Sequence, residues 1–177
     1  MKAIETALSL TQAYKLGIER FEKMLGDEFS KAIELMNKTN EHIIICGMGK
    51  SGLVGRKISS TLASTGTPSI FLHPAEAIHG DLGKVQKKSI VLLISYSGET
   101  EEIIALIPAF KRLNVTIVAL TGVKDSTLAS KADIILDTSV DREACPLNLA
   151  PTTSTMITMV LGDALAVSLM ELKNFKQ

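Results

Sequence analysis

The chain has 177 residues, of which 46% are hydrophobic and only 4% aromatic, so it fits one domain with an aliphatic core. Its 19 basic and 19 acidic side chains cancel, which argues against a protein that works by holding nucleic acid or an anionic membrane. The first residues lack the pattern of a signal peptide, and no uninterrupted apolar run has membrane-spanning length. We therefore expect a cytoplasmic protein without nucleic acid or membrane partners.

Helix and strand patterns alternate along the chain. Residues from about 3 to 39 have helical spacing, with a break near Gly26-Asp27. Short β-branched runs then predict strands that are buried on both faces, at His42–Gly47, Ser69–Leu72, Ile90–Ile94, Val115–Leu120 and Ile134–Leu136. Helices are expected between and after them, at Ser51–Ser64, Glu99–Leu113, about Ser126–Lys131 and Thr153–Leu172.

This alternation predicts an α/β fold of flavodoxin-like type. We expect a three-layer αβα sandwich around a doubly wound, parallel, five-stranded sheet. Residues 1–177 are expected to form a single domain, in which N-terminal helices (about 1–39) pack on a sheet-and-helix core (about 40–177). In such sheets ligands bind beyond the carboxyl ends of the strands, where the strand order reverses.

A glycine-rich loop, Gly47-Met48-Gly49-Lys50-Ser51-Gly52, follows the first strand. It matches a dinucleotide fingerprint, but the nearest acid after the second strand, Glu76, is displaced into the next loop. A P-loop would need glycine where the chain has Ile44. Two interpretations remain: an anion-binding turn that presents Lys50 and Ser51, or a tight turn whose glycines serve only backbone geometry.

A serine-rich loop, Ser95-Tyr96-Ser97-Gly98-Glu99-Thr100, follows the third strand, and a helix begins directly after it. Three hydroxyl groups, a flexible glycine and a helix N-terminus are what a dianionic phosphate requires. One hydroxyl, from Ser97 or Thr100, would suffice if the loop only capped the helix. The loop therefore predicts a phosphate site.

These two loops together resemble the sugar isomerase (SIS) domain family. Three further segments are similar to the arabinose 5-phosphate isomerases of that family: Ala63–Pro68, His73–Gly83 and Glu143–Thr152. The resemblance covers roughly residues 40 to 175 and lacks the CBS domains that often follow in the family. It implies interconversion of D-ribulose 5-phosphate and D-arabinose 5-phosphate through an enediol(ate), the entry step to the lipopolysaccharide sugar Kdo.

The resemblance also implies roles for individual residues. Catalytic roles fall on Lys50, Glu102, Glu143 and His79, and substrate or phosphate contacts on Ser51, Gly66, Thr67, His73, Ser95, Ser97 and Thr100. No cofactor and no metal is expected, and the partners are a small sugar phosphate and further copies of the chain in a homodimer or homotetramer. Two departures from the family stand out: Tyr96 replaces the usual amide residue, and the chain ends at Gln177, before a family segment with a functional histidine.

Isomerisation needs a base that removes a carbon-bound proton and a donor that stabilises the oxyanion. Glu143 is the leading candidate for the base, because partial burial would raise its pKa toward neutrality. Lys50 or His79 could stabilise the oxyanion, whereas Glu102 could merely favour a helix N-terminus. Alternatives are 6-phospho-3-hexuloisomerase, phosphoheptose isomerase and a non-catalytic sugar-phosphate sensor.

Overall fold

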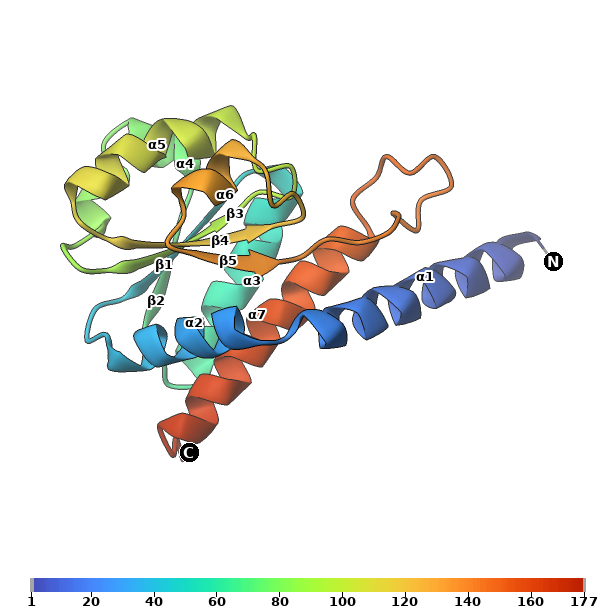
Figure 1. The fold of residues 1–177 in the computed structure, drawn as a ribbon, viewed down its shortest axis with the longest axis horizontal. Helices are drawn as coiled ribbons and strands as arrows, with labels where there is room; N and C mark the ends of the chain where they lie inside the picture. Colours follow the sequence, from blue (N-terminus) through green and yellow to red (C-terminus); the bar gives the residue numbers. More distant parts are fainter. Residues whose placement is uncertain (1, 177) are drawn as a thin grey trace.

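The computed structural model describes residues 2–176; residues 1 and 177, the ends of the predicted domain, lie outside the described residues. Helices and strands alternate after an N-terminal helical pair (Figure 1). The elements in chain order are α1 (Lys2–Met24), α2 (Asp27–Lys38), β1 (Ile43–Gly47), α3 (Gly49–Ser64), β2 (Ser69–Leu72), α4 (Pro74–Ile78), the 3-10 helix η1 (Asp81–Lys84), β3 (Ile90–Ile94), α5 (Glu101–Arg112), β4 (Thr116–Thr121), α6 (Thr127–Lys131), β5 (Ile134–Asp137) and α7 (Thr153–Leu172).

The five strands form one parallel sheet in the order β2-β1-β3-β4-β5. In β1, Ile45 lies opposite Phe71 of β2 on one side and Leu92 of β3 on the other. The chain first moves outward from β1 to β2 and then crosses back to β3, so the strand order reverses between β1 and β3. This confirms the predicted doubly wound sheet and places the expected ligand position beyond the ends of these two strands.

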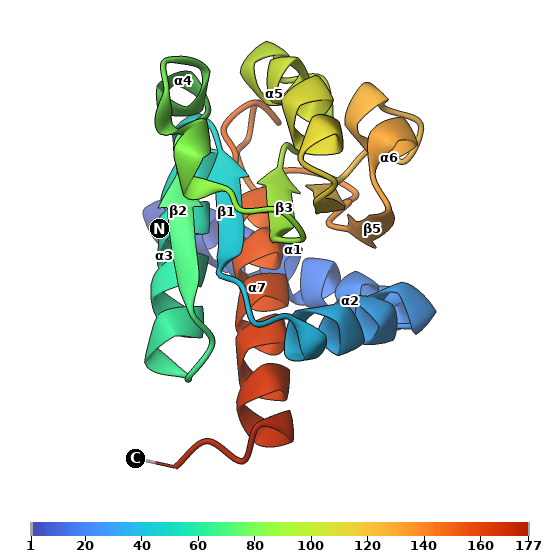
Figure 2. The ribbon, with the colours of Figure 1, turned by 90° about the vertical axis from the view of Figure 1, so that its left-hand side faces the viewer.

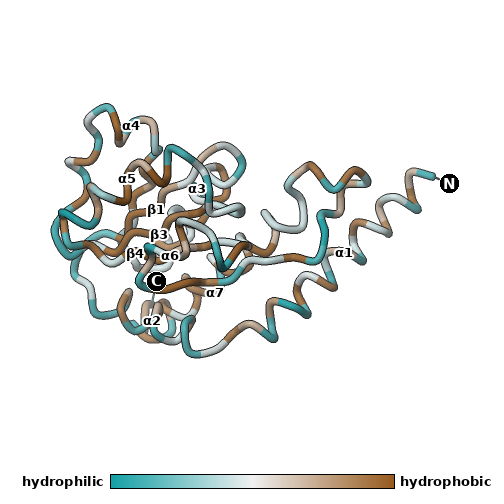
Figure 3. The backbone as a smooth tube through the Cα atoms, turned by 45° about the horizontal axis from the view of Figure 1, so that its top comes forward, coloured by the Kyte–Doolittle hydropathy of each residue, from teal (hydrophilic) through white to brown (hydrophobic). Residues whose placement is uncertain are grey.

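Two apolar cores lie on opposite faces of the sheet, because successive strand residues point to opposite sides. Ile43 and Ile45 face the core that α2, α3 and α7 cover, whereas Ile44 and Cys46 face the core under α4, α5 and α6. Figure 2 shows the two helical layers on either side of the strands, and Figure 3 shows the hydrophobic strands between them. The three-layer αβα sandwich is thus confirmed.

Most predicted elements are present, with small shifts at their ends. Helix α3 begins at Gly49 rather than Ser51, and α5 begins at Glu101 rather than Glu99, because Thr100 is an extended N-cap residue. Two short helices between β2 and β3, α4 and η1, were not predicted from the sequence. Each is about one turn long, which is too short to carry a helical hydrophobic period.

Helix α7 is apolar nearly all round. By length and composition it could cross a membrane, and it is the one such helix in residues 2–176. Its packing gives another reason for this composition: Ile157, Leu161 and Leu165 are buried, and the helix lies against α1, α2 and α3. Packing in the core therefore accounts for the apolar residues on the covered sides of the helix, whereas Val167 and Leu172 remain exposed.

Candidate functional site

Two loops meet at the point where the strand order reverses. The glycine-rich loop Gly47–Gly52 leaves the end of β1, and the serine-rich loop Ser95–Thr100 leaves the end of β3. Because Gly47 pairs with Ile94, the two loops start side by side at the carboxyl edge of the sheet. Helices α3 and α5 begin at these loops, so their positively polarised N-termini also lie at this edge.

Backbone geometry accounts for the glycines of the first loop. A Cβ atom on Gly52 would lie 2.6 Å from the carbonyl oxygen of Gly47, so α3 can approach the end of β1 this closely only without side chains there. Gly49 has a φ of 56°, in the left-handed region that glycine adopts at little cost. Lys50 is exposed and Ser51 half-buried, so both remain accessible to a ligand.

Hydroxyl groups hold the serine-rich loop in shape. The Oγ of Ser95 lies 2.7 Å from Oγ1 of Thr100 and accepts a hydrogen bond of 3.1 Å from the N–H of Gly98. The Oγ of Ser97 accepts from the N–H of Glu99 at 3.2 Å. Gly98 has a φ of 67°, and a Cβ there would lie 2.0 Å from Oγ of Ser126. Glycine is therefore required at the centre of this turn.

The N-terminus of α5 has no side-chain cap. Thr100 occupies the N-cap position but its hydroxyl makes no capping hydrogen bond within the described chain. The carboxylate of Glu99 turns away and accepts a hydrogen bond of 2.6 Å from the N–H of Thr127, at the start of α6. The simple capping interpretation therefore does not explain the three hydroxyls, and the free N–H groups of the first turn suit an anion.

A pocket of about 230 Å³ lies beside the two loops, between the start of α3, the start of α7 and the loop that joins β5 to α7. Of the predicted site residues, Ser51 and Glu143 line it. The other lining residues, which sequence reasoning did not assign to the site, are Tyr96, Asn148, Leu149, Pro151, Ser154, Thr155 and Thr158. The run of hydroxyl residues at 152–155, at the start of an apolar helix, was the signal available for part of this set.

Glu143 caps helix α7. Its Oε2 accepts hydrogen bonds from the N–H of Thr152 at 2.7 Å, from Oγ1 of Thr152 at 3.0 Å and from the N–H of Ser154 at 3.3 Å. All three bonds reach Oε2, so Oε1 has no donor from the described part of the chain. Burial alone would raise the pKa of Glu143, but the hydrogen bonds from Ser154 and Thr152 outweigh it and hold the pKa below its ordinary value. The expectation of a raised pKa is therefore wrong.

Four other predicted residues lie at the same edge of the sheet without lining this pocket. Lys50 is in the first turn of α3, and Glu102, half-buried, is in the first turn of α5. His73 follows β2 as the N-cap residue of α4, and His79 ends that helix as its C-cap residue. His73 is half-buried and His79 is exposed. These four residues follow the ends of β1, β2 and β3, and none of them lines the pocket that holds Glu143.

Gly66 and Thr67 lie at the opposite edge of the sheet. They precede β2, whose first residue pairs with the first residue of β1, so the length of a strand, about 15 Å, separates them from the serine-rich loop. The structure gives both residues other neighbours: a Cβ on Gly66 would meet the ring of Phe175 at 2.3 Å, and Lys173 donates a hydrogen bond of 3.1 Å to Oγ1 of Thr67. Within one chain, Gly66 and Thr67 therefore lie far from the serine-rich loop, and their contact with the sugar stays a prediction.

A larger pocket of about 680 Å³ lies elsewhere, between the junction of α1 with α2 and the outer edge of β5. Its charges are balanced: Lys31 pairs with Glu28 at 2.6 Å, and Lys124 pairs with Asp137 at 3.0 Å. It therefore lacks the surplus positive charge that would favour a phosphate. Residues 2–176 also hold no group of three or more His, Cys, Asp or Glu side chains placed to bind a metal ion.

The fold and the two loops define a sugar isomerase domain: the SIS domain family matches residues 35–168, and the chain belongs to that family. Arabinose 5-phosphate isomerase KdsD of Pseudomonas aeruginosa is 56% identical over 151 residues, which are 85% of this chain and 46% of that protein. KdsD of Francisella tularensis is 46% identical over 172 residues, covering 94% of this chain and 53% of that protein. The chain thus spans about half the length of these curated relatives.

A solved structure of similar length also matches. It is an Escherichia coli CFT073 protein in complex with arabinose 5-phosphate, with a TM-score of 0.91 and 37% identity, and the match covers 99% of this chain and 94% of that one. The shared region therefore includes all the helices and strands described above, together with both loops at the carboxyl edge of the sheet.

Proposed function

We propose that this chain is an aldose–ketose isomerase that interconverts D-ribulose 5-phosphate and D-arabinose 5-phosphate and so supplies Kdo synthesis in the cytoplasm. The proposal rests on one arrangement of residues at the point where the strand order reverses. The serine-rich loop leads into helix α5, whose N-terminus has no side-chain cap, and this loop lies beside a pocket that the carboxylate residue Glu143 lines. Relatives named arabinose 5-phosphate isomerase and a neighbour solved with arabinose 5-phosphate support the choice of substrate.

The phosphate group is proposed to bind at the serine-rich loop. The hydroxyl of Ser97, the free N–H groups of α5 and one hydroxyl of the Ser95–Thr100 pair would donate to its oxygens. The other hydroxyl of that pair donates to its partner. Ser51, which reaches the pocket from the start of α3, would donate from the other side. The hydrogen bond between Ser95 and Thr100 holds these two hydroxyls side by side before the ligand arrives.

Proton transfer is proposed to use Glu143. In the direction from ketose to aldose, its free Oε1 takes a proton from C1, giving a 1,2-enediol(ate), and a proton then returns to C2. The hydrogen bonds from Thr152 and Ser154, at the start of α7, fix Oε2 and thereby hold Oε1 in a defined direction. The same bonds lower the pKa of Glu143, so its carboxyl group is ionised at neutral pH. Lys50 and His79 would stabilise the charge that develops on O1 and O2, and Glu102 and His73 would orient the sugar.

Self-association is part of the proposal. The first half of α1 and the loop between β5 and α7 project from the same end of the molecule (Figures 1 and 3). Both carry apolar side chains in solvent: Ile4 and Leu8 are 67% and 62% exposed, and Leu147 and Leu149 are 75% and 77% exposed. A homodimer or homotetramer would bury them next to Glu143. Sedimentation as a monomer at micromolar concentration would contradict this.

Turnover distinguishes the isomerase from a non-catalytic sensor. The protein is incubated with D-ribulose 5-phosphate, and arabinose 5-phosphate is followed by NMR, with Glu143→Gln as the matched variant. We expect conversion by the wild type and a loss of about 100-fold or more in the variant. Binding without conversion would favour the sensor. Conversion of a hexulose or heptose phosphate in place of ribulose 5-phosphate would favour the two other isomerases.

A further inference from the structure

Tyr96 is the second residue of the serine-rich loop, yet its hydrogen bonds lead away from that loop. Its carbonyl oxygen accepts hydrogen bonds from the N–H of Gly122 at 2.9 Å and from Oγ1 of Thr121 at 3.2 Å. Its ring lies directly on Gly122, where a Cβ would approach the ring to 2.4 Å. The end of β4 therefore holds both the backbone and the side chain of Tyr96.

The hydroxyl group of Tyr96 reaches the segment that carries Glu143. Its Oη accepts a hydrogen bond of 3.3 Å from the N–H of Val140, three residues before Glu143. Tyr96 and Glu143 also line the same pocket. Tyr96, a residue of the predicted phosphate loop, is thus hydrogen-bonded to the segment 138–142, which joins β5 to the proposed base Glu143.

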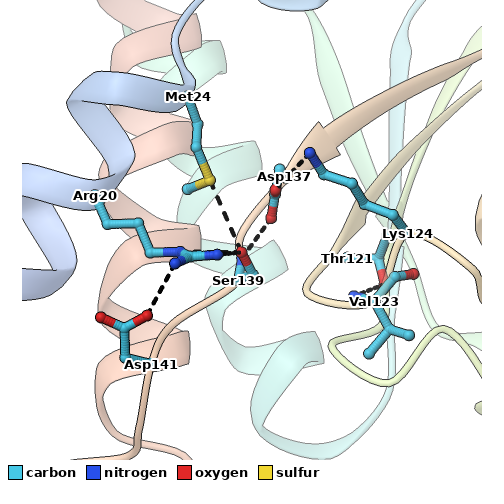
Figure 4. A network of polar contacts seen from close by, with 8 residues as sticks. All are labelled: Arg20, Met24, Thr121, Val123, Lys124, Asp137, Ser139 and Asp141. Carbon is cyan, nitrogen blue, oxygen red and sulfur yellow. Dashed lines mark hydrogen bonds and ion pairs between the residues drawn. The ribbon is translucent and has the colours of Figure 1, made fainter.

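Helix α1 and the end of β5 hold the other residues of this segment (Figure 4). Arg20 of α1 donates to Oγ of Ser139 at 2.9 Å and to Oδ1 of Asp141 at 2.8 Å. The carboxylate of Asp137 accepts from the N–H of Ser139 at 2.7 Å. Val140 lies between Ser139 and Asp141, and its N–H joins this segment to the phosphate loop through Tyr96. A shift of that loop would therefore reach Glu143 through Val140 and Asp141.

We propose that Tyr96 is a positioning residue, which couples occupancy of the serine-rich loop to the placement of Glu143. The inference rests on the proposed function for the identity of the base. Phosphate bound by Ser95, Ser97 and Thr100 would fix the loop, and the phenol would fix Val140 and hence the distance of Glu143 from the sugar carbons. The free energy gained by binding the phosphate would then offset the cost of placing Glu143 against the reacting carbon, and precise placement raises the rate.

Tyr96→Phe tests this, because it keeps the ring on Gly122 and removes only the oxygen. We expect kcat to fall roughly 3- to 10-fold, the effect of one hydrogen bond, with the affinity for inorganic phosphate unchanged. Tyr14→Phe, at the other tyrosine of the chain, is the matched control and should change neither quantity. Gly122→Ala, which pushes the ring away while keeping the hydroxyl, should reproduce the loss of kcat.

A second measurement is independent of turnover. Carboxyl NMR of Glu143 in the presence of phosphate should show its titration moved to higher pH in Tyr96→Phe, because the bonds to α7 loosen. Unchanged kcat and unchanged titration would overturn the inference, and so would weaker phosphate binding at constant kcat, which would make Tyr96 a direct phosphate contact. A wild type that converts no pentulose phosphate would overturn the proposed function, and the titration would still decide the role of Tyr96.

Discussion

The carboxylate of Glu143 and the backbone N–H of Thr152 are joined by a hydrogen bond of 2.7 Å, which ties the loop after β5 to the start of α7. A carboxylate at a helix N-terminus is stabilised by the helix dipole and by the unsatisfied N–H groups. Structural capping is compatible with the catalytic role that we propose, because these bonds all reach Oε2 and none of them reaches Oε1.

The first prediction concerns pH. The proposed base, Glu143, would act only when ionised, and its pKa lies below the ordinary value for a glutamate. We therefore expect kcat/KM to fall only at a pH below that ordinary value. Thr152→Val removes one donor to Oε2, so the pKa should rise and the acid limb of the profile should move to higher pH. A pH–rate profile of both proteins checks this. A limb that stays in place would mean that another group is the base.

The phosphate loop can be tested with little risk to the fold. Ser97 is exposed, and its one hydrogen bond to the chain is accepted from Glu99. Ser97→Ala should weaken binding of inorganic phosphate about 10- to 100-fold, because a hydrogen bond to a charged group contributes about 1.5–3 kcal/mol. Isothermal titration calorimetry measures this, with the exposed Ser130→Ala of α6 as control. Equal affinities in both variants would exclude Ser97 from the phosphate site.

Two glycines with the same backbone conformation should respond differently to alanine. Gly49 and Gly98 have φ values of 56° and 67°, so each substitution costs about 1–2 kcal/mol of backbone strain. Only at Gly98 would the new Cβ also meet another residue, Oγ of Ser126 at 2.0 Å, whereas the space around Gly49 is open. Urea unfolding should therefore show the larger loss for Gly98→Ala. Equal losses would contradict the described turn.

Substitution of Gly66 tests whether this residue contacts the sugar or only allows the packing of Phe175. Its φ of 85° and the ring of Phe175 leave no room for a Cβ, so Gly66→Ala should lower the free energy of unfolding by about 2 kcal/mol. Phe175→Ala should restore part of that loss in the double variant. Thermal unfolding measures both effects. If Gly66→Ala keeps full stability and loses affinity for the sugar phosphate, the result would instead support the predicted contact between Gly66 and the sugar.

Asp137 makes a separate contribution to stability. Burial tends to raise its pKa, but the bonds from Ser139 and the contact with Lys124 prevail and lower it. A lowered folded-state pKa means that this stabilisation is present above the unfolded pKa of about 4 and is lost as the pH falls through the folded value. Asp137→Asn should cost about 2 kcal/mol in urea unfolding at pH 7, and less as the pH falls below 4. A cost that does not change with pH would contradict the role of the charge.

The sequence predicted the fold well because its strands are continuous apolar runs, which only a sheet covered on both faces explains. The positions of both loops could also be predicted, since glycine and hydroxyl residues that directly follow a buried strand indicate an anion-binding turn. The sequence could not show that the bonds from Thr152 and Ser154 reverse the effect of burial on Glu143, because these contacts depend on how the loop folds back on α7. The placement of Gly66 under Phe175 depends in the same way on tertiary packing.

The most direct test of the account is conversion of D-ribulose 5-phosphate by this chain in D2O, followed by NMR. Removal of a proton from C1 and reprotonation at C2 predict that arabinose 5-phosphate forms and carries deuterium at C2. The same experiment with Glu143→Gln should show at least 100-fold slower formation. If the wild type binds the ketose phosphate and forms no arabinose 5-phosphate, the central claim is contradicted.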